Sequence, residues 1–354
     1  MTRIIATYLV HATPAEIEAR ARAIAIEQSV EMPLEAIADD FILRGIVGEV
    51  QSIADRGGGV FAVRIGLAAS TIGADAGQLF NMAFGNTSLQ EDVVLADLNV
   101  PPGLFPGPRV GIAGLRARTG AVGRAFTASA IKPQGLPPER LAAIAAGFAA
   151  GGIDFVKDDH GLADQHYAPF AARVPLCADA VRRAGHARYV PSVTGSLDAM
   201  RAQIGLARDC GLDCVMVAPM IAGPANVRAL ADEFPGMAFL AHPTLGGAAR
   251  IAPELLIGKL FPLLGADAVI FPNYGGRFGY SPGTCADLAA NARGLGAVPV
   301  PAGGMTLARV PEMLDFYGAD AMLLIGGSLL AARERLAEAT ARFANAVAAH
   351  RYRK

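Results

Sequence analysis

The sequence lacks tryptophan, has only four cysteines, and contains no apolar run long enough to cross a membrane. No two cysteines form a CxxC pair, which argues against a zinc knuckle or a redox motif and predicts reduced core thiols. A membrane helix needs about 18 or more apolar residues. The N-terminus also has no signal-peptide core. We therefore expect a cytoplasmic protein without a membrane partner.

An excess of charge of either sign is also missing. The formal net charge is -1 over 354 residues, and Lys and Arg do not cluster. Binding to the phosphate backbone of nucleic acid depends on concentrated positive charge, so nucleic acid is not an expected partner. Apolar residues make up 53% of the chain and charged residues 18%. This composition predicts a large core and no extensive disorder.

From Phe126 onward one pattern recurs: a short apolar run, a turn, and an Ala-rich amphipathic segment. Each apolar run has the length and composition of a strand buried on both faces of a parallel sheet. The predicted strands are 126–132, 153–159, 188–193, 213–219, 237–243, 267–273, 297–304 and 320–327. Eight such strand–helix units predict a (β/α)8 TIM barrel over residues 116–354.

Residues 1–115 do not follow this rhythm. Apolar runs at 4–10, 60–67 and 93–100 predict strands, whereas 14–29 and 75–85 predict helices. Strands mixed with helices in this order favour a small α+β domain of ferredoxin-like type. Pro and Gly accumulate at 101–111, where the chain is expected to pass between the two domains.

Polar side chains follow several of the predicted barrel strands. Catalytic groups of such barrels lie at the carboxyl ends of strands, so Lys132 and the run from Lys157 to His160 are candidates for chemistry. Desolvation at the barrel mouth makes a lysine easier to deprotonate, as a general base or a Schiff-base nucleophile requires. A structural ion pair with a carboxylate is the alternative explanation for Lys132.

The run Lys157-Asp158-Asp159-His160 should direct Lys157 and Asp159 to one side and Asp158 to the other, because side chains alternate along a strand. Carboxylate oxygens suit Mg²⁺, and imidazole suits softer metals. The run therefore predicts a divalent-metal site. Local ion pairing at the start of an exposed loop is the alternative.

Two glycine pairs and one histidine complete the set of candidates. Gly303-Gly304 and Gly326-Gly327 close the last two predicted strands, where barrel enzymes often bind phosphate through backbone N–H groups. Simple turn glycines are the alternative there. His242 follows the fifth predicted strand and could act as an acid or a base, or satisfy a structural hydrogen bond.

These residues lie in segments that resemble a known family. TASAIKPQGLPPE, GGIDFVKDDH, PAGGM and IGGSL are similar in order and spacing to the ribulose-bisphosphate carboxylase (RuBisCO) large chain, and within it to the RuBisCO-like, form IV proteins. AIEQSVEMP and FGNTSLQEDV extend the resemblance into residues 1–115. The resemblance covers nearly the whole chain.

The resemblance implies a role for each candidate. Lys132 matches a lysine that takes the proton in enolisation, and His242 matches a histidine beside the substrate. Lys157 matches a lysine that CO2 carbamylates to form a ligand for Mg²⁺. Asp159 matches a direct ligand, and His160 stands where a second carboxylate ligand is expected.

The remaining implied roles concern phosphate and assembly. Gly304, Gly326 and Gly327 match the backbone cradle of one phosphate. Glu27 and Asn86 match residues that one subunit contributes to the barrel of its partner. The resemblance thus implies a homodimer with shared active sites, with higher assembly possible in the family.

The chain also departs from the family pattern. The arginine and histidine that hold a second phosphate are replaced by Pro243 and Ile270, which predicts a substrate with one phosphate. The mobile-loop lysine is replaced by Arg277, which presents a planar fork in place of a point charge. Two further replacements are Gln134 for a lysine and Ala302 for a serine. CO2 fixation is therefore not expected.

The function expected from these features is metal-dependent enolisation of a singly phosphorylated keto-sugar or 3-oxo sugar acid. Because Arg277 and His160 could meet a substrate carboxylate, decarboxylation or C–C cleavage of the 3-oxo-isoapionate 4-phosphate type is the first expectation. The second is an enolase or isomerase acting on a 5-methylthio-pentulose 1-phosphate. A metal-independent Schiff-base aldolase is the third possibility, and a non-catalytic binding protein is the fourth.

Overall fold

The computed structural model describes residues 2–352, which divide into two units. The first unit contains the described residues up to Pro106 together with Leu245–Leu256, and the second begins at Gly107. The predicted boundary after residue 115 falls inside helix α3 (Gly111–Thr119), which belongs to the second unit. Leu115 of α3 is fully buried in the hydrophobic cluster of that unit.

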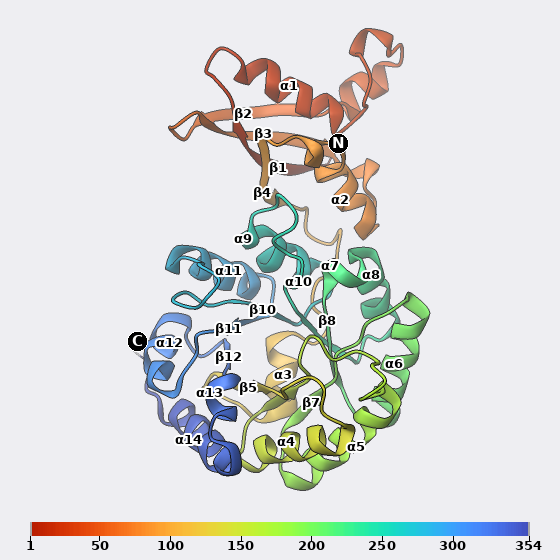
Figure 1. The fold of residues 1–354 in the computed structure, drawn as a ribbon. Helices are drawn as coiled ribbons and strands as arrows, with labels where there is room; N and C mark the ends of the chain where they lie inside the picture. Colours follow the sequence, from red (N-terminus) through yellow and green to blue (C-terminus); the bar gives the residue numbers. More distant parts are fainter. Residues whose placement is uncertain (1, 353–354) are drawn as a thin grey trace. The chain divides into compact units, whose positions relative to one another are not determined.

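The first unit is an α+β fold around a four-stranded antiparallel sheet. Its elements are β1 (Arg3–His11), α1 (Ile17–Glu27), β2 (Glu49–Asp55), β3 (Val60–Ala68), α2 (Ala76–Phe84), β4 (Val93–Asn99) and the short α9 (Pro253–Leu255). The strand order β2-β3-β1-β4 with the sequence βαββαβ confirms the ferredoxin-like prediction. Figure 1 shows this sheet with α1 alongside it.

Two features of the first unit were not predicted. Strand β2 has no continuous apolar side, since five of its seven residues are exposed, so the period-2 pattern of a strand is weak. The segment 245–256 joins this unit through Leu95, whose N–H donates to the Arg250 carbonyl at 3.0 Å and whose carbonyl accepts from Ala252 at 2.9 Å. Such a pairing between distant segments leaves no local sequence signal.

The second unit contains a ring of eight parallel strands, which confirms all eight predicted strands. They are β5 (Phe126–Ala130), β6 (Phe155–Lys157), β7 (Arg188–Val190), β8 (Cys214–Val217), β9 (Ala238–Ala241), β10 (Ala268–Pro272), β11 (Val298–Ala302) and β12 (Met322–Leu324). A bridge between Ser192 and Met216 joins the segment after β7 to β8 and closes the ring.

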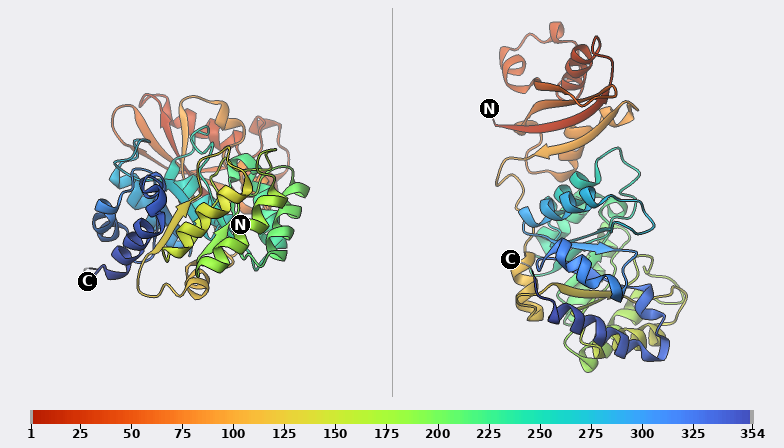
Figure 2. Two further views of the ribbon diagram at one scale, coloured as in Figure 1. Left: turned by 60° about the horizontal axis from the view of Figure 1, so that its bottom comes forward. Right: turned by 90° about the vertical axis from the view of Figure 1, so that its left-hand side faces the viewer.

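Helices cover the outside of these strands, as both views in Figure 2 show. They are α4 (Pro138–Ala150), α5 (Phe170–Ala184), α6 (Leu197–Asp209), α7 (Pro219–Ala222), α8 (Pro224–Glu233), α10 (Phe261–Leu263), α11 (Pro282–Gly294), α12 (Val310–Tyr317), α13 (Gly327–Leu330) and α14 (Leu336–Ala349). Among residues 2–352, no helix has both the length and the apolar character needed to span a bilayer.

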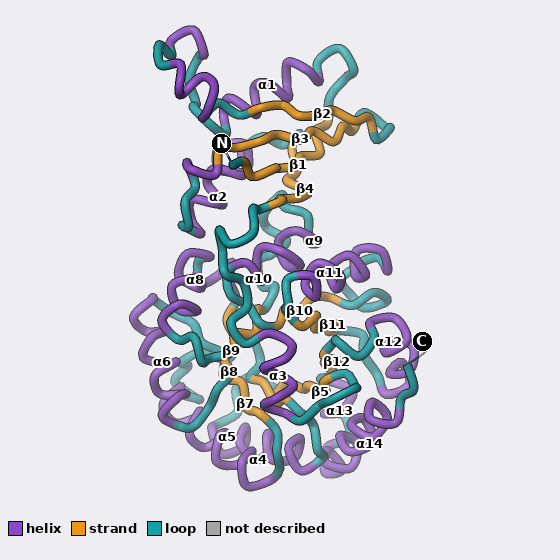
Figure 3. Tube along the Cα trace, turned by 180° about the vertical axis from the view of Figure 1, so that it is seen from behind, coloured by secondary structure: helices purple, strands orange, loops and turns teal. Residues whose placement is uncertain are grey.

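The interior of the barrel is filled by alternate strand residues, such as Phe126 and Ala128 of β5 and Val298 and Val300 of β11. Full burial of one large apolar side chain contributes about 1.5–3 kcal/mol, so this cluster stabilises the ring strongly. Helix α3 closes its amino end, where Arg118 donates to the Asp213 carbonyl just before β8. Figure 3 shows α3 lying across the ring.

Candidate active site

Five of the predicted site residues come from the ends of three barrel strands. Lys132 follows β5, Lys157 is the last residue of β6 with Asp159 and His160 directly after it, and His242 follows β9. Strands β5 and β6 are neighbours in the sheet. Because the carboxyl ends of parallel strands meet at the same end of a barrel, these short stretches place their side chains close together.

Lys132 and Asp159 form an ion pair between the two neighbouring strand ends. The Lys132 side chain is 41% exposed, whereas that of Asp159 is only 5% exposed. Burial alone would raise the pKa of Asp159, but hydrogen bonds from the Lys132 ammonium and the Gly161 N–H together lower it. The carboxylate pairing that was an alternative explanation for Lys132 is thus present, and its partner is another candidate site residue.

Lys157 is the most deeply buried member of the cluster, with 4% of its surface exposed. Its ammonium donates to the backbone carbonyl of Asp158 at 2.9 Å. Burial lowers the pKa of Lys157 to about 8, assisted by the positive charge of Lys132 and opposed by Asp159. A lowered pKa raises the fraction of neutral amine, which is the form that reacts with CO2 to give a carbamate.

Asp158 points away from the cluster, as the alternation along β6 predicts. Its carboxylate accepts hydrogen bonds from the Tyr189 hydroxyl at 2.6 Å and the Ser192 N–H at 3.0 Å, and it pairs with the fully buried Arg173 at 3.2 Å. Arg173 also donates to the carbonyls of Ala163 and Ala168. This network, which was not predicted, fixes the end of β6 and so orients Lys157 and Asp159.

His160 and His242 form a stacked pair, with ring centroids 4.4 Å apart and ring planes within 9°. His160 also contacts Asp159, with 3.2 Å between Nδ1 and Oδ1. Burial, together with the positive charge of Lys157, lowers the pKa of His242 to about 2. Burial likewise lowers the pKa of His160 against the opposing charge of Asp159. Both rings are therefore neutral near neutral pH, and His242 can exchange hydrogen bonds without carrying charge.

A divalent cation fits this cluster on one condition. Among residues 2–352, no three or more His, Cys, Asp and Glu side chains are grouped so as to hold a metal by themselves. Asp159 and His160 supply two ordinary ligand groups on the same side of the β6 end. A third ligand, the second that supplies oxygen, would come from a carbamate on Lys157, whose lowered pKa favours its formation. The donor set is complete only with that modification.

The two glycine pairs follow adjacent strands, β11 and β12. Gly303 and Gly304 have φ of +83° and +64°, a conformation in which glycine is favoured. A Cβ on Gly304 would lie 2.8 Å from the Cα of Gly276, so the loop after β10 approaches it closely. The space beside Gly326 and Gly327 is open on the side where a Cβ would stand. Backbone N–H groups there can approach a phosphate closely.

Arg277 lies in the loop after β10 and is exposed. Its guanidinium stacks on the Phe278 ring at 4.8 Å, and its charge acts on the His160 imidazole. Asn273, which directly follows the same strand, instead turns into the core. There its amide oxygen accepts from the Tyr317 hydroxyl at 2.6 Å. Arg277, but not Asn273, can therefore meet a ligand at the barrel mouth.

The residues at which this chain departs from the family pattern lie in different structural surroundings. Ile270 lies inside β10, is 2% exposed and belongs to the apolar cluster of the barrel. Its side chain therefore cannot bind a second phosphate. Pro243 directly follows His242 and supplies no hydrogen-bond donor. Gln134 lies against the backbone of Gly161, where an added Cβ would collide with its amide.

Glu27 and Asn86 are brought together within the first unit. The Asn86 side-chain amide donates to Glu27 at 2.9 Å and to Glu31 at 3.0 Å. Glu27 ends α1, and Asn86 follows α2. Their contribution to the barrel of a partner subunit stays a prediction.

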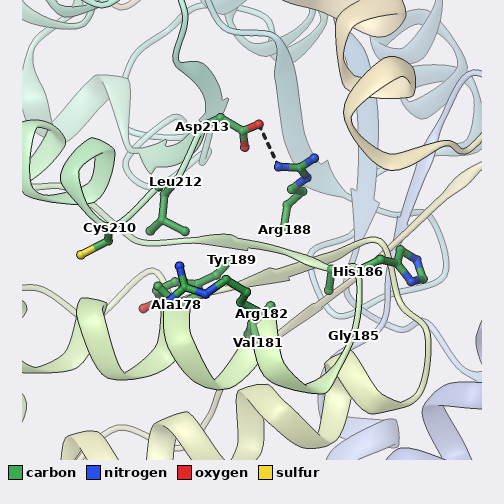
Figure 4. A pocket seen from close by; sticks show the side chains of 12 residues that line it. Ala178, Val181, Arg182, Gly185, His186, Arg188, Tyr189, Cys210, Leu212 and Asp213 are labelled. Carbon is green, nitrogen blue, oxygen red and sulfur yellow. Dashed lines mark hydrogen bonds and ion pairs between the residues drawn. The ribbon is translucent and has the colours of Figure 1, made fainter.

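A cavity of about 190 Å³ lies at the amino end of the barrel strands, opposite the candidate active site. Figure 4 shows Arg188 at the start of β7 facing Asp213, just before β8, and the two side chains form an ion pair at 3.2 Å. Arg188 also donates to the Arg118 carbonyl of α3. Residues at this end of a barrel usually serve stability, and the paired charges here connect α3 to the ring.

Comparison with known proteins assigns the chain to a family. The model for the ribulose bisphosphate carboxylase large chain, catalytic domain, matches residues 111–258. The 5-methylthioribulose-1-phosphate isomerase of Rhodospirillum rubrum is 58% identical, with 98% of this chain and 96% of the relative covered. The ribulose bisphosphate carboxylase-like protein 1 of Rhodopseudomonas palustris is 56% identical, with 98% of each covered. The chain belongs to the RuBisCO-like proteins.

A solved structure supports the same assignment. The crystal structure of a Rubisco-like protein from Rhodopseudomonas palustris matches with a TM-score of 0.93 and 51% identity, and all of both chains is covered. The resemblance inferred from the strand-end motifs is therefore confirmed for this RuBisCO-like protein, as is its two-part fold. One contact at the site had no sequence motif to reveal it: the hydroxyl of Thr244 lies 2.6 Å from Nδ1 of His242.

Proposed function

We propose that this RuBisCO-like protein isomerises a singly phosphorylated 5-methylthio-pentulose. The observation that carries the proposal is the cluster at the β5, β6 and β9 ends, where two lysines, a carboxylate and two neutral imidazoles meet. The substrate class is taken from the Rhodospirillum rubrum relative, which is named 5-methylthioribulose-1-phosphate isomerase and is 58% identical. Decarboxylation, the first expectation from sequence, has no counterpart in the names of the relatives reported above.

The proposed reaction moves a carbonyl group along the sugar chain. A base removes the proton from the carbon beside the carbonyl, and the electron pair of the broken C–H bond forms an enediolate. A proton then returns to the former carbonyl carbon, and the hydroxyl proton passes from the oxygen that becomes the new carbonyl to the oxygen that becomes a hydroxyl. The product is the isomeric ketone, so no oxidant or reductant is consumed. Proton transfer of this kind requires a positioned acid–base group.

Lys132 is the proposed base. It stands at the end of β5 with its side chain 41% exposed, and its ammonium pairs with Asp159. Lys132 can accept the substrate proton only after it has lost its own, and Asp159 then stabilises the ammonium form that results. His242 is neutral and would bind a substrate hydroxyl without adding charge.

The glycine pairs after β11 and β12 are the proposed phosphate site. Backbone N–H groups attract an anion without bringing a bulky side chain, and Ser328 connects the two loops by donating to the Met305 carbonyl at 3.2 Å. A substrate with one phosphate rather than two is supported by Ile270, which lies in the apolar cluster of the barrel, and by Pro243, which supplies no hydrogen-bond donor. The thioether end of a methylthio-pentulose needs no charged partner.

Asp159, His160 and a carbamate on Lys157 are the proposed ligands of a divalent cation, with Mg²⁺ first because two of the three ligands supply oxygen. When bound, the cation would stabilise the negative charge that develops on the substrate oxygen. His160 widens the choice toward metals that imidazole suits, such as Zn²⁺ and Fe²⁺. A Schiff base on Lys157 is disfavoured, because only 4% of that residue is exposed.

Direct assay of the purified protein tests the function. We expect 5-methylthioribulose 1-phosphate, incubated in deuterated water with Mg²⁺ and bicarbonate, to give an isomeric ketose phosphate carrying deuterium, without release of CO2. Proton and phosphorus NMR follow both substrate and product. A 3-oxo sugar acid phosphate that releases CO2, while the pentulose stays unchanged, would overturn the proposal. Borohydride trapping of a substrate on lysine would instead favour the aldolase chemistry.

Shared active sites in a homodimer are the proposed assembly, and subunit mixing tests it. We expect Glu27→Ala and Lys132→Met each to be inactive alone, but their co-expressed mixture to recover roughly a quarter of wild-type activity. Random pairing gives mixed dimers in about half of the cases, and each mixed dimer holds one complete site of two. Two affinity tags allow the mixed dimer to be purified. A mixed dimer as inactive as its parents would show that Glu27 acts within its own subunit.

A further inference from the structure

The position of His242 is constrained from several sides. Its backbone N–H donates to the Val217 carbonyl of β8 at 2.8 Å, so the main chain is held by the neighbouring strand. One face of its ring stacks on His160. Its Nδ1 contacts the Thr244 hydroxyl at 2.6 Å. The stack fixes the plane of the ring, while the hydroxyl contact distinguishes one ring nitrogen from the other.

A neutral imidazole carries one proton, on either Nδ1 or Nε2, and its hydrogen-bond partners decide between them. The hydrogen-bond partner of Nδ1 in this structure is the Thr244 hydroxyl, at 2.6 Å. A hydroxyl oxygen there can accept the ring proton, which leaves Nε2 unprotonated.

We propose that Thr244 is a positioning residue that accepts the Nδ1–H of His242 and so leaves Nε2 as a hydrogen-bond acceptor toward the substrate. An acceptor there would bind a substrate hydroxyl and keep the ring from turning. The hydroxyl of Thr244 reaches the substrate only through His242. The kinetic consequence rests on the isomerase function proposed above, whereas the tautomer of His242 does not.

Thr244 is well placed for this task by its local sequence. It follows Pro243, whose ring restricts the backbone between the two residues, and both come shortly after β9. Serine would keep the hydroxyl at this position. Valine has nearly the same shape as threonine without the hydroxyl, so the pair of substitutions separates the hydrogen bond from packing.

Nitrogen-15 NMR of histidine-labelled protein tests the proposal directly. The chain has six histidines, and the His242 signals are identified by their loss in His242→Asn. We expect wild type and Thr244→Ser to show a protonated Nδ1 and an unprotonated Nε2. In Thr244→Val the two His242 signals should move toward each other as both tautomers become populated. The signals of the histidines outside the stacked pair with His160 should stay in place and report an intact fold.

Steady-state kinetics supply the second measurement. Loss of one hydrogen bond from a reacting group corresponds to about a tenfold fall in kcat, and we expect that fall in Thr244→Val with KM changed less than about twofold. Thr244→Ser should retain wild-type kcat.

Three results separate the possible failures. A single Nδ1–H tautomer in Thr244→Val would overturn the proposal. A rise in KM with kcat unchanged would overturn it too, because Thr244 would then contact substrate. If wild type does not turn over the methylthio-pentulose phosphate, the proposed function fails, while the NMR comparison still decides the role of Thr244.

Discussion

Replacing Lys132 with methionine is expected to lower kcat by about 10³-fold, whereas KM for the phosphorylated pentulose should change little. Positioned acid–base catalysis contributes about 10²–10⁴-fold, and methionine keeps much of the length of lysine without a proton-accepting atom. The phosphate cradle after β11 and β12 is left intact, so binding should persist. Rates of deuterium incorporation measure the proton-transfer step directly.

Lys132→Arg is the matched control for charge. Arginine keeps a positive partner for the buried Asp159 carboxylate, but it does not lose its proton at accessible pH. We expect this variant to be nearly as inactive as Lys132→Met. If Lys132→Arg instead kept most of the wild-type rate, Lys132 would serve as a fixed charge and another group would move the proton.

Removal of divalent metal is expected to lower activity by about 10²-fold or more, since the charge stabilisation that a cation gives to a developing oxyanion amounts to several kcal/mol. Dialysis against EDTA followed by addition of Mg²⁺ should restore the rate. Restoration should be fuller with bicarbonate present, because the third ligand requires a carbamate on Lys157. The measurement is the initial isomerase rate before and after each addition.

Two variants test whether Lys157 and His160 are ligands of the metal. Lys157→Met should stay inactive whether or not bicarbonate is added, because it cannot form the carbamate. His160→Asp supplies a second carboxylate, and we expect it to strengthen the preference for Mg²⁺ over metals that imidazole suits, such as Zn²⁺. Full activity of the EDTA-treated wild type would exclude a metal role and leave the chemistry to Lys132 and the two histidines alone.

Much of the barrel could be predicted because the pattern that marks each strand lies within a short stretch of sequence. Each strand is an apolar run with a polar or glycine end, so the positions of Lys132, Lys157 and the glycine pairs along the chain follow from the sequence pattern. Strand β2 was not predicted because most of its side chains are exposed, so the sequence shows no alternation of apolar and polar residues there. The place of segment 245–256 in the first unit was not predicted, because it depends on hydrogen bonds to Leu95, which is distant in the sequence.

Sequence by itself determined which residues stand at strand ends, and the alternation after Lys157 separated Asp159 from Asp158. Only the tertiary structure decided which of these side chains meet. The pairing of Lys132 with Asp159 depends on β5 lying beside β6, and the stacking of His160 on His242 joins two strand ends that are not neighbours in the sheet. The physical reason is that a hydrophobic pattern fixes the direction of side chains along one strand, whereas contact between strands depends on closure of the whole ring.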